Sequence, residues 1–108
     1  AGLAIGLGVC RAPRAATYGD RSIAAGECFA IRGELLLAVA PEPAPALLAA
    51  LAGLDLGGRS VLTLHRGREL DPDSHEAAAA AVRAAWPDLQ VEAAEGGQGR
   101  YLLWVSIE

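Results

Sequence analysis

The chain has 108 residues, of which 53% are hydrophobic but only 5% aromatic, and its formal net charge is −4, with arginine as the sole basic residue type apart from histidine. A chain of this length forms one domain at most. Because aromatic residues are few, we expect a core that consists mainly of Ala, Leu and Val. An acidic domain lacks the basic face that non-specific binding to phosphates needs, so we expect no nucleic-acid partner.

The first twelve residues, AGLAIGLGVCRA, are apolar and rich in glycine. Gly2, Gly6 and Gly8 lack the spacing of a dinucleotide-binding loop, so we predict a strand or short helix packed closely against a neighbour. The stretch is too short to cross a bilayer and lacks the basic start of a signal peptide. We therefore expect a cytoplasmic domain without a membrane span, in which residues 1–12 belong either to this fold or to the end of a preceding domain.

The two cysteines, Cys10 and Cys28, have no second pair with which to complete a metal site. We expect two small buried thiols in a reducing cytosol. Cys28 falls within a predicted strand, which is not the electropositive, partly exposed setting that a reactive thiolate needs.

Residues 27–40 predict two strands joined by a tight turn at Gly33, because glycine can take a positive φ. The preceding residues 11–22 are polar and rich in turn formers. The prolines of residues 41–45 close the second strand and open a helix that runs to about Leu54. The apolar face of this helix consists of Leu47, Leu48 and Leu51.

Residues 60–65, SVLTLH, predict a buried strand bounded by glycines. The clearest helix follows within residues 71–88. Asp71 or Asp73 can cap its start. The proline after Trp86 discourages helical geometry at that residue, so we expect the helix to end there.

The last two predicted strands are residues 89–95 and 101–107. Alternation in the first indicates one exposed face, whereas the second is nearly all apolar, as in a strand covered on both faces. The order is β-β-α-β-α-β-β, to which the N-terminal stretch can add one strand. Helices between strands imply crossovers, so part of the sheet should be parallel, with a hairpin at each end. We expect an α/β (α+β) fold, a two-layer sandwich of two helices on a mixed sheet of about five to six strands.

Histidines, acids and arginines cluster after the third predicted strand, where α/β folds often bind ligands. His65 and His75 have acidic neighbours, but their spacing matches no zinc signature, and we expect His75 to be solvated. Arg66 and Arg68 flank a glycine in the following loop. Two guanidiniums beside a glycine can hold a carboxylate or a phosphate, and the alternative is a solvated loop that counters the nearby acids.

The chain ends in EGGQGRYLLWVSIE, residues 95–108. Gly96 and Gly97 permit backbone angles closed to other residues, and Gln98 offers both a donor and an acceptor. Between two strands, these residues predict a hairpin turn pinned by the glutamine. The alternative is a loop, extending to Arg100, that touches a partner.

Residues 58–108 carry several short motifs in a fixed order, namely TL-x-x-G, an acid-opened helix, PD-x-x-VE, GGQ-x-x-Y and a terminal S-x-E. The motif positions are Thr63, Leu64, Gly67, Pro87, Asp88, Val91, Glu92, Gly96, Gly97, Gln98, Tyr101, Ser106 and Glu108. In this order and spacing the segment resembles the C-terminal end of the large subunit of bacterial fatty-acid kinase, a protein of the dihydroxyacetone-kinase-like group.

The resemblance is looser upstream. Residues 16–38 share Thr17, Ile23, Gly26 and Gly33 with that family. Glu27 replaces the family's usual aspartate, and Gly99 stands where the family usually has proline. We still expect the turn before the last strand to form.

The resemblance implies that the chain is the C-terminal part of a longer multidomain protein. The kinase domain, with its ATP and Mg²⁺, would then lie outside this sequence, and this domain would hold no catalytic residue, cofactor or metal. Such C-terminal regions are associated with docking a small fatty-acid-binding protein, whose bound acyl carboxylate the kinase phosphorylates for phospholipid synthesis. By this resemblance, the domain would dock that protein or support assembly of the kinase dimer. The candidate docking residues, chosen by loop position and residue type, are Gly96, Gly97, Gln98, Arg100, Arg66 and Arg68.

Two alternatives stay open. One is a small α/β domain that binds an anionic small molecule near Arg66, Arg68 and His65. The other is a purely structural module that dimerises, with residues 1–9 as its exposed apolar surface.

Overall fold

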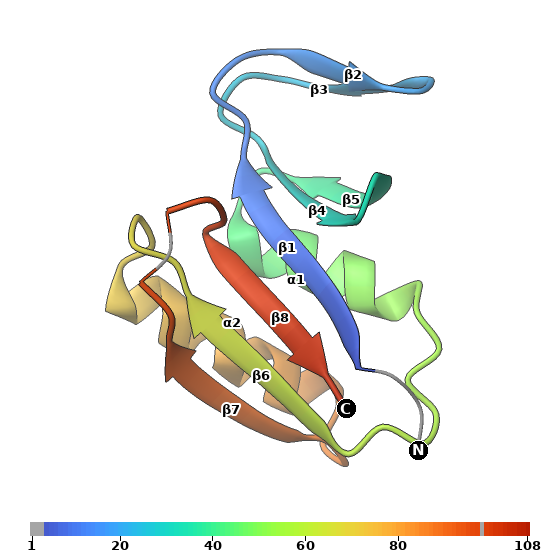
Figure 1. The fold of residues 1–108 in the computed structure, drawn as a ribbon, viewed down its shortest axis with the longest axis vertical. Coiled ribbons are helices and arrows are strands. Elements are labelled where there is room, and N and C mark those ends of the chain that lie inside the picture. The colour runs from blue at the N-terminus through green and yellow to red at the C-terminus, as the bar shows by residue number, and fades with distance from the viewer. Residues whose placement is uncertain (1–3, 98) are drawn as a thin grey trace.

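The computed structural model describes residues 4–97 and 99–108, which form a main mixed sheet with helices on one of its faces and a separate two-stranded sheet (Figure 1). The helices are α1 (Pro43–Ala52) and α2 (Pro72–Ala85). The strands of the sheet are β1 (Ile5–Arg11), β4 (Cys28–Arg32), β5 (Leu35–Ala40), β6 (Val61–Arg66), β7 (Gln90–Glu95) and β8 (Leu103–Ile107). Within the described residues the sheet has six strands in the order β5-β4-β1-β8-β6-β7, so the expected two-layer sandwich is confirmed.

Alternate side chains of the sheet strands face the helices and form the core. The buried strand residues include Ile5, Leu7, Val9, Leu62, Leu64, Leu103, Val105 and Ile107. The helices add small or aliphatic side chains to the same cluster, among them Ala46, Leu47, Leu51, Ala78, Ala79 and Val82. Alanine lets the helices lie close to the sheet, which is how a core with few aromatic residues reaches native packing density.

The N-terminal strand β1 lies in the middle of the sheet. It pairs antiparallel with β4 on one side and with β8 on the other. The expectation of an exposed apolar surface over residues 1–9 is therefore wrong for the described part of that stretch, because Ile5, Leu7 and Val9 are buried. Residues 1–3 lie outside the described residues.

The expected hairpin between the last two strands is also wrong. β7 pairs in parallel with β6, and β8 runs antiparallel between β1 and β6. Residue composition explains the arrangement, since β7 carries Gln90, Glu92 and Glu95, which suit a solvated edge, whereas β8 is apolar enough for the centre. The helices cover β8 on one face only, and not on both as its composition suggested.

The other predicted elements are confirmed. β4 and β5 form a hairpin whose turn contains Gly33 at φ 62°. α2 begins after Asp71, whose carboxylate accepts a hydrogen bond from the Ser74 backbone N–H at 3.0 Å, and Trp86 caps its end. Among the described residues, no helix is long and apolar enough to cross a membrane.

Residues 16–23, most of which fall in the polar stretch 11–22, form a hairpin that composition did not predict. β2 (Ala16–Tyr18) pairs with β3 (Arg21–Ile23) in a separate small sheet, which projects beyond the main one (Figure 1). Tyr18 of β2 packs against Phe29 of β4, with the two ring centroids 6.0 Å apart. This contact connects the β2–β3 hairpin to the main sheet.

Two aromatic rings cover glycines of β1 on the face of the sheet that carries no helix. A Cβ atom at Gly6 would lie 2.8 Å from the Trp104 ring, and one at Gly8 would overlap the Tyr101 ring. The two ring centroids are 5.2 Å apart. A glycine in a strand often marks such a close approach, and here the missing side chains make room for the rings.

We predict that Gly8→Ala destabilises the fold by about 1–3 kcal/mol, because the Tyr101 ring must leave its position. The free energy of unfolding in urea would measure this loss. The matched control is Gly53→Ala, since a Cβ at Gly53 meets the carbonyl oxygens of Ala50 and Ala49 at ordinary contact distances of 3.6 and 4.0 Å. The control should change stability by less than about 0.5 kcal/mol. Equal losses in the two variants would contradict the proposed role of Gly8.

Candidate partner-binding surface

One end of the sheet gathers most of the residues selected from the sequence. β1, β6 and β7 end there and β8 begins there, as their pairing registers require. We call this region the loop end, defined by residues 66–70, 95–97 and 99–102. It brings together Arg66, Arg68, Gly96, Gly97 and Arg100, whereas Gln98 lies outside the described residues.

Arg66 joins three segments of the loop end. Its guanidinium donates to the Glu95 carboxylate at 2.6 Å and to the Leu70 carbonyl oxygen at 2.6 Å. The hydrogen bond from Arg66 is the main reason why the pKa of Glu95 lies below its ordinary value. Because these contacts occupy the guanidinium, we assign Arg66 a structural role in holding β6, β7 and the following loop together.

The glycine pair ties the segment after β7 to β6. The backbone N–H groups of Gly96 and Gly97 both donate to the Arg66 carbonyl oxygen, at 3.0 and 2.9 Å. Gly97 has φ 69°, which favours glycine. A Cβ at Gly96 would lie 3.0 Å from that same oxygen. These glycines therefore let the chain cross the end of β6 on its way to β8.

Arg68 and Arg100 reach the exposed part of the loop end. The Arg68 guanidinium lies against Gly99, where any side chain would overlap it. Gly99 thus provides room that a proline at this position would fill. The Arg100 guanidinium carbon lies 5.7 Å from the centre of the Tyr101 ring, which is within cation–π range.

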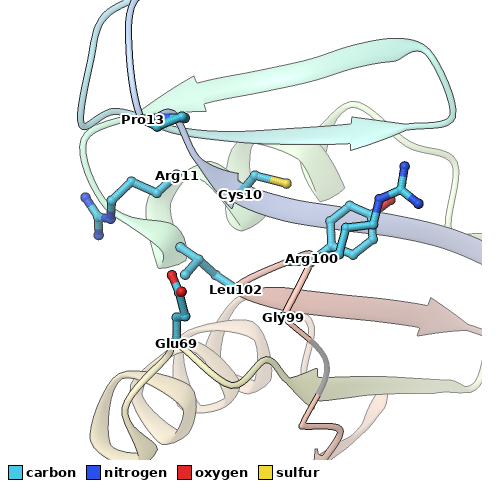
Figure 2. Close-up of a pocket in the computed structure, with 8 residues that line it drawn as sticks. Cys10, Arg11, Pro13, Glu69, Gly99, Arg100 and Leu102 are labelled. Atoms are coloured by element: carbon cyan, nitrogen blue, oxygen red, sulfur yellow. The ribbon is translucent and has the colours of Figure 1, made fainter.

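A pocket of about 250 Å³ lies between β1, the residue 67–70 loop and the start of β8 (Figure 2). Figure 2 shows the Cys10 thiol pointing toward the side of Arg100, and Arg11 pointing the other way, toward the side of Glu69. Arg11 donates to the Gly26 carbonyl oxygen at 2.8 Å, which fixes its orientation. The pocket thus has a cationic group on either side and one carboxylate.

Both cysteines are poor nucleophiles in this fold. Burial raises the pKa of the Cys10 thiol to about 11, although the Arg100 charge opposes the shift. Burial also raises the pKa of Cys28, which is fully enclosed in the core. The expectation of buried thiols therefore holds for Cys28, whereas Cys10 is half-buried on the pocket wall.

The two histidines lie on opposite faces of the sheet and form no joint site. His75 is 5% exposed, and its Nε2 donates to the Leu64 carbonyl oxygen at 2.8 Å, so the expectation of a solvated side chain is wrong. The first turn of α2 faces the core at this position. His65 faces the other way, with its Nε2 3.5 Å from the Ser106 hydroxyl. Within residues 4–97 and 99–108, no three His, Cys, Asp or Glu side chains are grouped to hold a metal ion.

The helix-free side of the sheet is a surface that the sequence analysis did not identify. We call it the open face. Its residues on the five strands from β5 to β6 are Leu36, Val39, Phe29, Ile31, Gly6, Gly8, Cys10, Trp104, Ser106, Val61, Thr63 and His65. The available signal was the alternation of these residues with the core residues, which needs the strand order before it defines a surface.

A family model that describes the C-terminal domain of FakA-like fatty acid kinase proteins matches residues 7–108. No curated protein matches the chain.

The ion pair between Arg66 and Glu95 should make stability depend on pH. Because the folded pKa of Glu95 is depressed, the pair stabilises the fold above the ordinary glutamate value of 4.5, and this contribution is lost as the pH falls through the folded pKa. We predict that Glu95→Gln lowers stability at pH 7 and that its difference from wild type disappears in acid. Urea unfolding at several pH values would measure this. Glu34→Gln, at the exposed β4–β5 turn, is the control, and an identical pH profile for both variants would refute the assignment.

We predict that Cys10 reacts slowly with iodoacetamide in the folded chain. With a pKa of about 11, its thiolate fraction at pH 8 is on the order of a hundredfold below that of a thiol at the ordinary value of 9.0. Intact-mass spectrometry would follow labelling, and its rate should keep rising to about pH 11. Labelling in urea is the control. Fast labelling of the native chain at pH 8 would contradict the prediction.

Proposed function

The chain belongs to the family of FakA-like fatty acid kinase C-terminal domains, and from that premise we propose that it is a non-catalytic domain that docks the kinase's fatty-acid-binding partner protein. The docking surface in this proposal is the loop end. Phosphoryl transfer, with its ATP and Mg²⁺, belongs to another domain of the parent protein, which acts in the cytoplasm.

The observation that carries the proposal is the convergence of Arg68, Arg100 and Tyr101 on one exposed region. Arginine and tyrosine are enriched at protein interfaces, because each combines a large contact area with hydrogen-bonding groups. The region also has a concave element, the pocket beside Cys10. We expect the partner to present an acidic side chain to these arginines.

The loop end is supported rigidly enough to present these side chains. Arg66 fastens β6 to Glu95 of β7, and the Gly67 N–H donates to the Leu102 carbonyl oxygen at 2.8 Å. The Leu102 N–H in turn donates to the Val9 carbonyl oxygen at 2.8 Å. A surface held by such contacts loses little conformational freedom on binding, which favours affinity.

The anionic-ligand alternative has less support. Arg66 is engaged by Glu95 and the Leu70 carbonyl oxygen. His65 lies on the open face and contacts Ser106. Arg66 and His65, two of the three residues chosen for that alternative, therefore already contact other protein groups, and we do not propose an anion site there.

Calorimetric titration of the chain with the fatty-acid-binding protein tests the docking proposal. We predict that the Arg68→Ala, Arg100→Ala double variant weakens binding about tenfold or more, and that added salt weakens the wild-type complex. The matched control for each single variant, Arg68→Ala or Arg100→Ala, is Arg32→Ala, which removes the same one positive charge from an exposed arginine at the other end of β4.

Circular dichroism would verify that each variant remains folded. Absence of binding by the folded wild-type chain would refute the docking proposal. An equal loss in the Arg32 variant would show that the arginines act only through net charge, and would remove the loop end as the site.

A further inference from the structure

Gly99 is a glycine that its own φ angle does not require. Its φ is not positive, in contrast to that of Gly97, which is 69°. Residues with side chains readily adopt a negative φ. Space is what excludes a side chain here, because a Cβ at Gly99 would overlap the guanidinium of Arg68. This glycine therefore serves the position of Arg68 rather than the path of the chain.

The overlap at Gly99 involves only the flexible end of the Arg68 side chain. The three atoms nearest to a Cβ at Gly99 are Nη2, Cζ and Nε of Arg68, with Cζ at 3.0 Å and Nε at 3.5 Å. By contrast, a Cβ at Gly67 would overlap the carbonyl oxygen of Tyr101, which belongs to the backbone. A methyl group at residue 99 would therefore displace the Arg68 guanidinium and leave the fold intact.

The backbone around Arg68 is held in place by hydrogen bonds. The Gly67 N–H donates to the Leu102 carbonyl oxygen at 2.8 Å, and the Leu70 N–H donates to the Gly67 carbonyl oxygen at 3.2 Å. Within residues 4–97 and 99–108, the Arg68 side chain itself has no hydrogen bond or ion pair. Its contact with Gly99 is therefore what places the guanidinium.

We propose that Gly99 is a positioning residue for partner recognition, which holds the Arg68 guanidinium against the residue that precedes Arg100. The inference rests on the proposed docking function and identifies what sets the charge pattern of that surface. Arg68 and Arg100 come from two different loops, and Gly99 lets them present their charges to one acidic group of the partner. A guanidinium that is already positioned loses less freedom on binding, which favours affinity.

Charge gives this arrangement its selectivity. The whole chain carries a net charge of −4, so most of its surface disfavours an acidic partner group. Two guanidiniums in one exposed region repel each other, and an anion that contacts both relieves this repulsion. The position of Arg68 therefore determines where an acidic group of the partner is accepted. A larger residue at position 99 would remove that preference without removing either arginine.

A double-mutant cycle between Gly99 and Arg68 tests the inference, with calorimetric titration of the fatty-acid-binding protein as the readout. We predict that Gly99→Ala weakens binding about threefold to tenfold, because Arg68 loses its position. In the Arg68→Ala background, the same change should weaken binding by less than about twofold. Gly53→Ala is the control, since it adds the same methyl group at the end of α1 and should leave affinity unchanged.

Two further readouts separate positioning from a general loss of structure. The Nε–Hε resonance of Arg68 in the NMR spectrum of the free chain should shift in Gly99→Ala, whereas that of Arg32 should not. Urea unfolding of Gly99→Ala should keep the wild-type midpoint. Binding by this variant should also depend less steeply on salt than binding by wild type, because one charge contact is weakened.

The outcomes distinguish this inference from the docking proposal. Absence of binding by wild type refutes docking and the recognition role together, and the NMR comparison then decides whether Gly99 positions Arg68. If wild type binds and Gly99→Ala binds equally well, Gly99 has no role in recognition. A loss that is as large without Arg68 as with it would show that Gly99 acts by another route. An unchanged Arg68 resonance would overturn the positioning role itself.

Discussion

The pairing of β1 with β8 is the contact on which the rest of the structure depends. These are the first and last strands of the main sheet, and they lie side by side at its centre. Their helix-facing residues are buried, and Leu7 and Val105 are completely so. Every other strand of the main sheet and both helices are arranged around this pair, because the two halves of the sheet meet nowhere else.

The same pair also shapes the side of the sheet that the helices leave uncovered. Because β1 alternates glycine with Ile, Leu and Val, it contributes buried side chains to the core on one face and presents glycine backbone on the other. The rings of Trp104 and Tyr101 lie against that glycine backbone. One strand sequence therefore serves both the interior of the domain and the open face.

Local sequence signals predicted most elements of the fold. Alternation, capping at Asp71 and the proline after Trp86 placed the helices and most of the strands, because these signals act within a few residues. The order of strands across the sheet was harder. Nothing local tells the segment after Glu95 to cross the end of β6, since the hydrogen bonds to the Arg66 carbonyl oxygen come from residues that are distant in sequence.

The sequence also predicted only part of the candidate site. Residue type and loop position selected Arg68 and Arg100, which do lie at one end of the sheet. Sequence did not reveal that Arg66 is bound to Glu95, because that pair depends on the parallel register of β6 and β7. It also placed His75 in solvent, whereas the helix turns this side chain toward the core.

The central position of β8 has a consequence for how the chain is made on the ribosome. Residues 103–107 emerge after all the other strands, yet they fill a slot between β1 and β6 rather than extending an edge. Until synthesis reaches them, the two halves of the sheet have no shared strand, and their apolar edges stay unpaired. A truncation before Leu103 would thus split the core rather than shorten it.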